Sequence, residues 1–516
     1  MKAYELIQQL EDEHWRTIKT RQIKDLIAAL SGLYLEASAV ASEANPGSTV
    51  EINIETVNRS SADMRLLSTQ LTKGRADIHN MELGNNQKTV FKQKAQIDPN
   101  ADYTGPYWLL KKGSLGVYNV EDPNLIGKPE TPRALMATFN LEIAGKPISF
   151  DRTVIRRYSK PDKGEIYEPF EILPAATASF KDKVLLFPDG NAKPVPVTVV
   201  AHKDDLEGEI EIKTASGWQV DQPKQEFSIS RKGEEVTLNF MLTPPATESE
   251  DYIYPVIRIN GNEITHQLEV IPYSHIPKQS VLLPAEVKVV RLNLEKAGEN
   301  IGYIPGAGDN VPESLRQIGY NVQLVEPEDI QQGELNKYDA IVVGIRAYNV
   351  SEDLKFKQPI LMEYVKNGGT LVLQYNTAGR RDRPFTQLAP YPLKLSRDRV
   401  TDENSEVNFL AASHPVLNFP NPITKKDFEG WVQERGLYFP DEWDERFTPV
   451  LSMNDEGESA KSGSLLVTSY GKGHYIYTGL SFFRELPAGV PGAYKLFTNI
   501  LSIGKKNLKK KPNIKG

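Results

Sequence analysis

The stretch YDAIVVGIRAYN, residues 338–349, decides the fold of the C-terminal half of the chain. Its first half is a near-continuous apolar run, which is typical of a strand buried on both faces of a parallel sheet. A helical pattern ended by two glycines follows, and then a second buried run, TLVLQYN at 370–376. Strands that alternate with helices in this way predict an open, mostly parallel sheet with helices on both faces.

Upstream of this region the hydrophobic pattern changes to short runs of period two, separated by Asn, Gly, Pro and Asp turns, which is typical of β-sandwiches. The pattern divides the chain into six parts. We expect a helical segment at 1–36, a β-sandwich at 37–150, a charged connection at 151–173, an Ig-like β-sandwich at 174–275, an α/β domain at 284–504 and a basic tail at 505–516. The helical segment cannot bury its own apolar stripe, so we expect it to pack on the next domain or on a domain that this chain lacks.

Composition narrows the class of protein. A chain of 516 residues with 39% hydrophobic residues can form several packed cores, and its net charge of −7 comes from interspersed charges of both signs. Such a chain lacks the clustered basic face of a nucleic-acid binder, so no nucleic-acid partner is expected. No run approaches the roughly 18 apolar residues of a membrane span, and the N-terminus MKAYELIQQLEDEHW has no export-signal pattern. The absence of cysteine excludes disulfides and thiolate metal sites.

One segment is similar to a metal-binding motif. VTVVAHKDDLEGEI carries His202, Asp204 and Asp205, and it resembles the AHPDDE motif with which a zinc-dependent deacetylase holds its metal. Lys203 and Leu206 depart from the motif, and the segment lies between two amphipathic strands, which favours a β-turn. The seven histidines are scattered and none forms an i, i+4 pair, so neither a metal nor a cofactor is expected.

The loop IPGAGDN, with Gly306 and Gly308, has two interpretations. It could cradle a phosphate, but Val311 stands where a dinucleotide fingerprint requires its third glycine, and no Gly-Lys-Ser/Thr follows. A tight turn from a strand into a helix is the interpretation that the sequence favours.

Four longer segments carry a family resemblance. They are PYWLLKKGSLGVYNV at 106–120, RRYSKPDKGEIYEPFEILP at 156–174, PNPITKKDFEGWVQERGLYFPDEWDERFTPVL at 420–451 and YGKGHYIYTGLSFFRELPAGVPGAYKLFTNIL at 470–501. Together they resemble the C-terminal part of the large PIG-L (LmbE-like) deacetylases of Bacteroidota-type bacteria. In that family a zinc deacetylase domain that acts on N-acetylglucosamine-type amides precedes these domains. The resemblance therefore implies a partner deacetylase domain, a carbohydrate ligand and a periplasmic location, but without the HPDDE segment it implies no deacetylase activity for this chain.

The last domain further resembles the flavodoxin-like fold of class I glutamine amidotransferase-like proteins, and more closely their ThuA-like branch. In an active amidotransferase the strand after Gly-Gly leads into an elbow that bears the cysteine nucleophile. Here Gln374, Tyr375 and Asn376 stand at that elbow, and none of them replaces a thiol. The resemblance therefore implies a ligand pocket without glutamine hydrolysis.

Polar side chains follow three strands of the expected parallel sheet. The carboxyl ends of parallel strands meet at one edge of a sheet, so these side chains can converge on one ligand pocket. The candidate ligand-binding residues of the three loops are Asp309, Asn310, Arg346, Tyr348, Asn349 and Asn376. The alternative is that Arg346 and Asp309 form an ion pair while the asparagines cap turns.

Two further segments contribute candidates. His414 lies on the rim of the pocket in the ThuA-like interpretation, or else it is a loop histidine bonded to the backbone. Tyr477, Arg484 and the turn PAGVPGAY either face the pocket or have a structural role.

The segment around Trp431 also has two interpretations. On a helix, Asp427, Trp431 and Glu434 would share one face, where the indole can stack on a sugar while the carboxylates accept bonds from its hydroxyl groups. The competing interpretation is a packed Trp431 braced by contacts of Asp427 and Glu434 with Arg435.

Three functions remain open. A non-catalytic accessory region that binds carbohydrate for a partner deacetylase is favoured, because two sandwich modules suit binding and spacing and no nucleophile is recognisable. The second is a ThuA-like enzyme that acts on a sugar through Asp427, Glu434 or His414 as acid or base. The third is a structural scaffold at the cell envelope.

Overall fold

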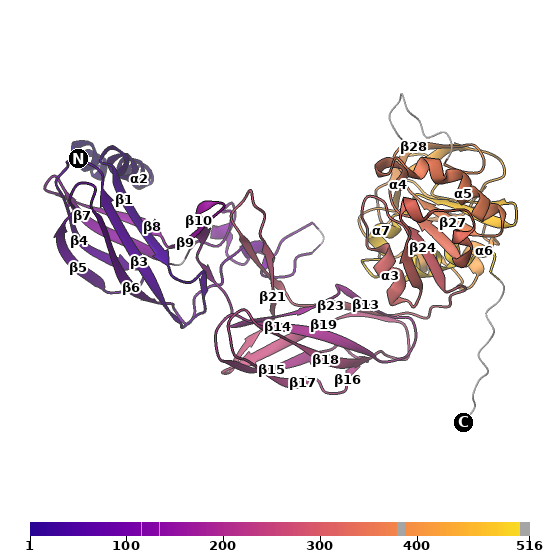
Figure 1. Ribbon diagram of the computed structural model, residues 1–516, viewed down its shortest axis with the longest axis horizontal. Helices are drawn as coiled ribbons and strands as arrows, with labels where there is room; N and C mark the ends of the chain where they lie inside the picture. The colour runs from indigo at the N-terminus through magenta and orange to yellow at the C-terminus, as the bar shows by residue number, and fades with distance from the viewer. Residues whose placement is uncertain (115, 134, 379–387, 506–516) are drawn as a thin grey trace.

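The chain is a multi-domain, β-rich protein. The computed structural model describes residues 1–114, 116–133, 135–378 and 388–505, and it arranges them in three lobes in a row (Figure 1). Apart from Lys505, the basic tail expected at 505–516 lies outside the described residues. No helix in the described ranges combines the length and the apolar character needed to cross a membrane.

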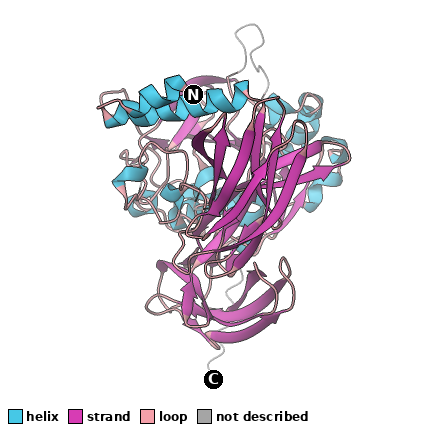
Figure 2. Ribbon diagram, turned by 90° about the vertical axis from the view of Figure 1, so that its left-hand side faces the viewer, coloured by secondary structure: helices cyan, strands magenta, loops and turns pink. Residues whose placement is uncertain are grey.

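Two helices begin the chain and lie together across the end of the first lobe (Figure 2). They are α1 (Lys2–Gln8) and α2 (Glu13–Leu30). The carboxylate of Asp12 accepts a bond from the backbone N–H of Trp15 and so caps α2 at its start. The helical segment expected at 1–36 is too long: α2 ends at Leu30, and after Gly32, at a φ of 56°, the chain enters β1. Residues 33–36 are strand because Leu33 and Leu35 are buried in the sandwich core beneath.

The first lobe is a sandwich of two antiparallel-rich sheets that share one core. One sheet has the order β10-β9-β1-β3-β6 and the other has the order β5-β4-β7-β8. Their bounds are β1 (Leu33–Ala39), β3 (Thr49–Asn58), β4 (Met64–Leu71), β5 (Ala76–Glu82), β6 (Lys88–Gln96), β7 (Met136–Ile143), β8 (Lys146–Thr153), β9 (Ile155–Lys160) and β10 (Gly164–Pro169). Short β2 (Glu43–Ala44) pairs with β11 (Glu171–Ile172).

The connection expected at 151–173 is instead part of this sandwich. Strand β9 pairs with β1, and β10 extends the sheet as its edge strand. The charges that suggested a linker belong to the sheet, since Arg157 of β9 forms ion pairs with Glu36 and Glu55.

The second lobe is another sandwich, and it is larger than the expected 174–275. Its sheets have the orders β12-β14-β18-β16 and β13-β23-β19-β15-β17, with β20 paired to β19. The bounds are β12 (Ala176–Phe180), β13 (Val184–Phe187), β14 (Lys193–Ala201), β15 (Leu206–Lys213), β16 (Gln219–Val220), β17 (Lys224–Ile229), β18 (Glu235–Thr243), β19 (Ser249–Ile259), β20 (Asn262–Ile264) and β23 (Val287–Arg291). A separate hairpin joins β21 (His266–Ile271) to β22 (Gln279–Pro284).

Strand β23 explains the difference in boundary. It pairs with β13 and β19 of the sandwich, although it falls in the range 284–504 that was assigned to the α/β domain. Val287 and Val289 face the core of the second sandwich, whereas Val290 and Leu292 belong to the core of the third lobe. The second and third lobes therefore share a strand and pack against each other through it.

The third lobe is built on a seven-stranded sheet with the order β25-β24-β26-β27-β34-β33-β31. The first five strands in this order run parallel, and β33 and β31 are antiparallel additions. The bounds are β24 (Asn300–Ile304), β25 (Asn321–Leu324), β26 (Ala340–Val343), β27 (Thr370–Gln374), β31 (Thr448–Pro449), β33 (Leu465–Tyr470) and β34 (Gly473–Thr478). Two smaller pairs, β28 (Leu393–Val400) with β30 (Gly436–Trp443) and β29 (Asn408–Phe409) with β32 (Leu451–Ser452), lie beside it.

Helices cover both faces of this sheet. Alternate residues of one strand enter different cores, so that Val342 packs with α3 and α8 while Val343 packs with α5. The helices of this lobe are α3 (Val311–Gln317), α4 (Ala347–Val350), α5 (Leu354–Lys366), α6 (Pro415–Asn418), α7 (Phe482–Glu485) and α8 (Pro491–Ser502). The loops at the carboxyl ends of β24, β26 and β27 are thereby fixed side by side.

Candidate functional site

The loop after β24 is held by a buried hydrogen-bond group. The hydroxyl of Tyr303 donates to the carboxylate of Asp309, at 2.6 and 2.7 Å from its two oxygens, and Gln374 Nε2 donates to the same hydroxyl at 3.1 Å. Burial raises the pKa of Asp309 and that of Tyr303. No ion pair joins Asp309 to Arg346 in the described part of the chain, so Asp309 is an internal anchor. Asn310 is exposed at the start of α3, and its side chain makes no capping bond.

The loops after β26 and β27 are braced by the two predicted asparagines. Asn376 is fully buried, and its Oδ1 accepts a bond from the backbone N–H of Tyr348 at 3.0 Å. Asn349 Oδ1 accepts from the backbone N–H of Thr377 at 2.9 Å. Tyr348 is itself buried and bonded to Gln358. Asn349 and Asn376 thus hold the two loops together through bonds to backbone N–H groups. This role is close to the alternative in which the asparagines cap turns.

A group of aromatic and charged side chains lies beside these loops, at the carboxyl ends of β26 and β27. The ring of Tyr375 stacks on Tyr438, with centroids 5.8 Å apart and planes 11° apart, and contacts Phe483 at 5.3 Å. Arg484 Nε donates to Glu434 Oε1 at 2.9 Å, and its guanidinium lies over the Phe483 ring. We call these residues, together with the exposed Arg346, the strand-end cluster: Arg346, Tyr375, Glu434, Tyr438, Phe483 and Arg484.

The charged side chains of the cluster affect the ionisation of the Tyr375 hydroxyl. Burial raises the pKa of the Tyr375 hydroxyl, and the positive charges of Arg346 and Arg484 act in the opposite direction. The sequence predicted Arg346, Glu434 and Arg484 as candidates, and the structure brings them together around Tyr375. It adds Tyr438 and Phe483, whose proximity no sequence pattern signals because they come from separate segments of the chain.

Two members of the cluster and one neighbouring residue adopt a left-handed backbone conformation that non-glycine residues rarely adopt. The φ angles are 54° at Arg346, 69° at Gln433 and 53° at Tyr438. Strained residues of this kind gather at ligand sites, where the surrounding structure holds them in place. At Arg346 and Tyr438, the left-handed backbone sets the direction in which the side chain leaves the chain.

Trp431 is not a sugar-stacking residue. The expected helix stops early, because the 3-10 helix η5 (Lys425–Phe428) ends before it, and Trp431 is only 4% exposed. Its ring packs on Phe428 and Phe482, and its Nε1 donates to the backbone carbonyl of Asp427 at 3.1 Å. The carboxylate of Asp427 caps η5 by accepting bonds from Thr424. Asp427, Trp431 and Glu434 therefore do not form one binding face.

Glu485 is a buried acid that the sequence did not single out. It is fully buried at the end of α7, and its Oε2 accepts a bond from the backbone N–H of Val432 at 2.9 Å. Its Oε1 has no hydrogen-bond partner in the described residues. Burial raises the pKa of Glu485 to about 8. Its position inside the apolar run SFFRELPAGV was the available signal.

His414 lies away from the strand-end cluster. Its Nδ1 accepts a bond from the backbone N–H of Val416 at 3.2 Å, at the start of α6. Burial lowers the pKa of His414, and so does nearby His474. His474 is the second residue of β34, and its backbone N–H donates to the carbonyl of Gly369 just before β27, so this is the amino-terminal edge of the sheet. The backbone-bonded alternative describes His414, and the rim position was wrong.

The two motif-like segments are turns. Residues 202–205 connect β14 to β15, and His202 bonds to Thr177 and Glu43. A Cβ atom at Gly306 would lie 2.0 Å from the carbonyl oxygen of Ile345, so this glycine allows the β24 and β26 loops to touch. Within the described ranges, no three His, Asp or Glu side chains are grouped so that they could hold a metal ion.

Comparisons with known proteins give no family. Neither a protein-family model nor a curated protein matches the chain. Among solved structures, the native conformation of Escherichia coli alpha-2-macroglobulin matches at 8% identity and a TM-score of 0.18, over 50% of this chain and 16% of that one. The exo-β-1,4-mannosidase Op5Man5 of Opitutaceae bacterium strain TAV5 matches at 10% identity and a TM-score of 0.26, over 40% of this chain and 36% of that one.

A third structure, the Caenorhabditis elegans MSP family member WR4, matches at 12% identity and a TM-score of 0.14, over 22% of this chain and 97% of that one. The chain thus spans only 16% of the macroglobulin. Similarities at these TM-scores carry no functional argument, so function must be argued from the side chains.

Proposed function

We propose that this chain is a non-catalytic accessory region that binds carbohydrate at the strand-end cluster and serves a PIG-L-type deacetylase. The observation that carries the proposal is the stacked pair of Tyr375 and Tyr438, flanked by Arg346 and by the Glu434–Arg484 pair. Aromatic rings offer apolar faces to sugar rings, while charged side chains beside them take the hydroxyl groups.

The third lobe is interpreted here as a degenerate class I glutamine amidotransferase-like domain of the ThuA-like branch. The parallel order β25-β24-β26-β27-β34 and the helices on both sheet faces support this interpretation. Tyr375 follows β27 where such enzymes carry a nucleophile. The polar groups around it are occupied: Asn376 and Asn349 brace loops, and Asp309 is bound to Tyr303.

Calorimetry of the full chain with a panel of neutral and N-acetylated oligosaccharides tests the proposal. We expect heat of binding with at least one N-acetylglucosamine-containing glycan, and about a tenfold loss of affinity in Tyr438→Ala. The matched control is Tyr254→Ala, which removes an exposed tyrosine from β19 of the second sandwich.

The outcomes separate the three functions. Equal binding by Tyr438→Ala and the Tyr254→Ala control would remove the cluster from the proposal. No heat with any glycan would leave the scaffold at the cell envelope as the better account. Turnover of a sugar that is lost in Glu434→Gln would instead favour the ThuA-like enzyme.

A further inference from the structure

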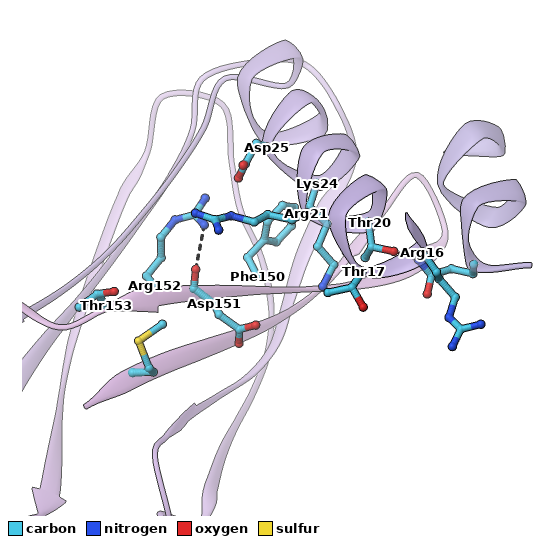
Figure 3. Close-up of a pocket in the computed structure, with 12 residues that line it drawn as sticks. Arg16, Thr17, Thr20, Arg21, Lys24, Asp25, Phe150, Asp151, Arg152 and Thr153 are labelled. Atoms are coloured by element: carbon cyan, nitrogen blue, oxygen red, sulfur yellow. Dashed lines mark hydrogen bonds between the residues drawn. The ribbon is translucent and has the colours of Figure 1, made fainter. Parts of the chain in front are cut away.

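The first lobe holds a groove between helix α2 and strand β8, at the other end of the molecule from the strand-end cluster (Figures 1 and 3). Its volume is about 720 Å³, within the range of roughly 300–1,000 Å³ that small-molecule sites occupy. Helix α2 lines it with two rows of residues four apart, Arg16, Thr20 and Lys24 in one and Thr17, Arg21 and Asp25 in the other.

Strand β8 supplies the opposite wall, with Asp151, Arg152 and Thr153. Arg152 leans on the Phe150 ring at 5.7 Å and donates from Nη1 to the backbone carbonyl of Asp151 at 2.9 Å. Figure 3 shows Arg152 from the strand and Arg21 from the helix reaching toward the same part of the groove. Two guanidinium groups that approach each other repel unless an anion lies between them.

The cations of the groove have no acidic partners among the residues that the structure describes. Across the described residues, no ion pair involves Arg21, Lys24 or Arg152, although Asp25 and Asp151 also line the groove. Asp151 instead accepts a bond from Thr138 at 2.6 Å. Four cations and two carboxylates therefore line the groove, and one of the cations, Arg16, donates to the Leu10 carbonyl at 2.7 Å.

Some other cations of the same lobe do have acidic partners. Arg157 is bound by Glu36 and Glu55, Lys92 by Glu51 and Lys146 by Glu5. Other first-lobe cations, such as Arg59, Arg75 and Lys94, also form no ion pair with the described residues. The groove cations differ in that they line one groove, which suits a ligand that brings its own negative charge.

We propose that this groove binds the phosphate group of a phosphomonoester. The forked guanidinium groups of Arg21 and Arg152 take two phosphate oxygens, and the ammonium group of Lys24 takes the third as a point charge. The hydroxyl groups of Thr17 and Thr20 contact the organic part of the ligand. This site is independent of the carbohydrate function proposed for the third lobe.

Calorimetry of the full chain in phosphate-free, low-salt buffer tests the proposal with inorganic phosphate, glucose 6-phosphate and glucose. We expect binding of the two phosphates and none of glucose. Arg21→Gln and Arg152→Gln should each weaken binding about tenfold, because each removes a charge-assisted hydrogen bond. Arg397→Gln is the matched control, since Arg397 is an exposed arginine of β28 at the far end of the molecule.

A second arm identifies the source of the phosphate. Co-sedimentation with phosphatidic acid vesicles that is lost in Arg21→Gln would make a lipid headgroup the source, whereas glucose 6-phosphate binding without co-sedimentation would make it a soluble ester. Circular dichroism melting confirms that each variant is folded, and Lys24→Gln repeats the test should one of them fail to fold. The proposal is overturned by absence of binding to every phosphate probe, or by equal affinities in Arg21→Gln and Arg397→Gln.

Discussion

Glu485 shows how one buried side chain can make stability depend on pH. The carboxyl group is fully buried, with one oxygen bonded to Val432 N–H, and burial raises its pKa to about 8 from the ordinary value of 4.5. Between those two values the folded chain holds a proton that the unfolded chain has released. The contribution of Glu485 to the free energy of unfolding therefore falls as pH rises through this window, and it is highest below it.

We expect Glu485→Gln to abolish this part of the pH dependence, because the amide keeps the bond to Val432 and carries no charge. At pH 8 the variant should be more stable than the parent by on the order of 4 kcal/mol, and near pH 5 the two should differ by about 1 kcal/mol or less. Urea denaturation at a series of pH values measures this. Glu429→Gln, at an exposed glutamate nearby, is the control, and parallel profiles for parent and Glu485→Gln would contradict the prediction.

At the scale of elements, the contact of two loops shapes the candidate site. Gly306 lies against the carbonyl of Ile345, the residue before Arg346, and Ala307 N–H donates to that carbonyl at 2.8 Å. The loop after β24 thus sets the position of the loop after β26. The left-handed backbone of Arg346 depends on this support.

Gly306→Ala should separate these loops, since its Cβ would lie 2.0 Å from the Ile345 oxygen. We expect a loss of about 1–3 kcal/mol in the free energy of unfolding, as for other overpacked sites, together with weaker glycan binding at the strand-end cluster. Thermal melting and calorimetry measure the two effects. Gly190→Ala, where an added Cβ meets nothing within 4 Å, should change neither; an equal effect of both substitutions would refute the loop-contact explanation.

Local patterns predicted individual elements well. Two glycines end α5 as predicted, and an apolar run predicts β27. The positions of other side chains could not be predicted, because they depend on packing between segments far apart in the sequence. Trp431 is buried because Phe482, 51 positions later, packs on it, and His414 lies at the amino edge because α6 packs with α8 there. Arg346 and Glu434 were predictable as polar loop residues, but their grouping with Tyr438 depends on the full fold.

At the scale of the whole molecule, the second and third lobes form one packed unit. Gln317 of α3 accepts a bond from Leu186 N–H and donates one to the Val184 carbonyl, both at 3.1 Å. Lys288 of β23 donates to the carbonyl oxygens of Ala488 and Gly489 at 3.2 Å. These contacts join β13 to α3 and join β23 to the turn between α7 and α8.

A fragment of residues 284–505 should therefore be less stable than one of residues 174–505. The shorter fragment keeps β23 but loses both of its partner strands, and it exposes the apolar side chains that Val184 and Leu186 cover. We expect a single urea transition for the longer fragment and a lower midpoint, or aggregation, for the shorter one. Equal midpoints would show that the third lobe folds independently of the sandwich.

Strand β23 also has an evolutionary consequence. Val289 and Val290 are neighbours in the chain, yet the first belongs to the core of the sandwich and the second to the core of the α/β lobe. Which substitutions are tolerated at each of these two adjacent positions therefore depends on a different set of packing neighbours. In an alignment of relatives, residue 289 should covary with core residues of the sandwich, and residue 290 should covary with core residues of the last lobe. Two adjacent positions would then be constrained by two different domains.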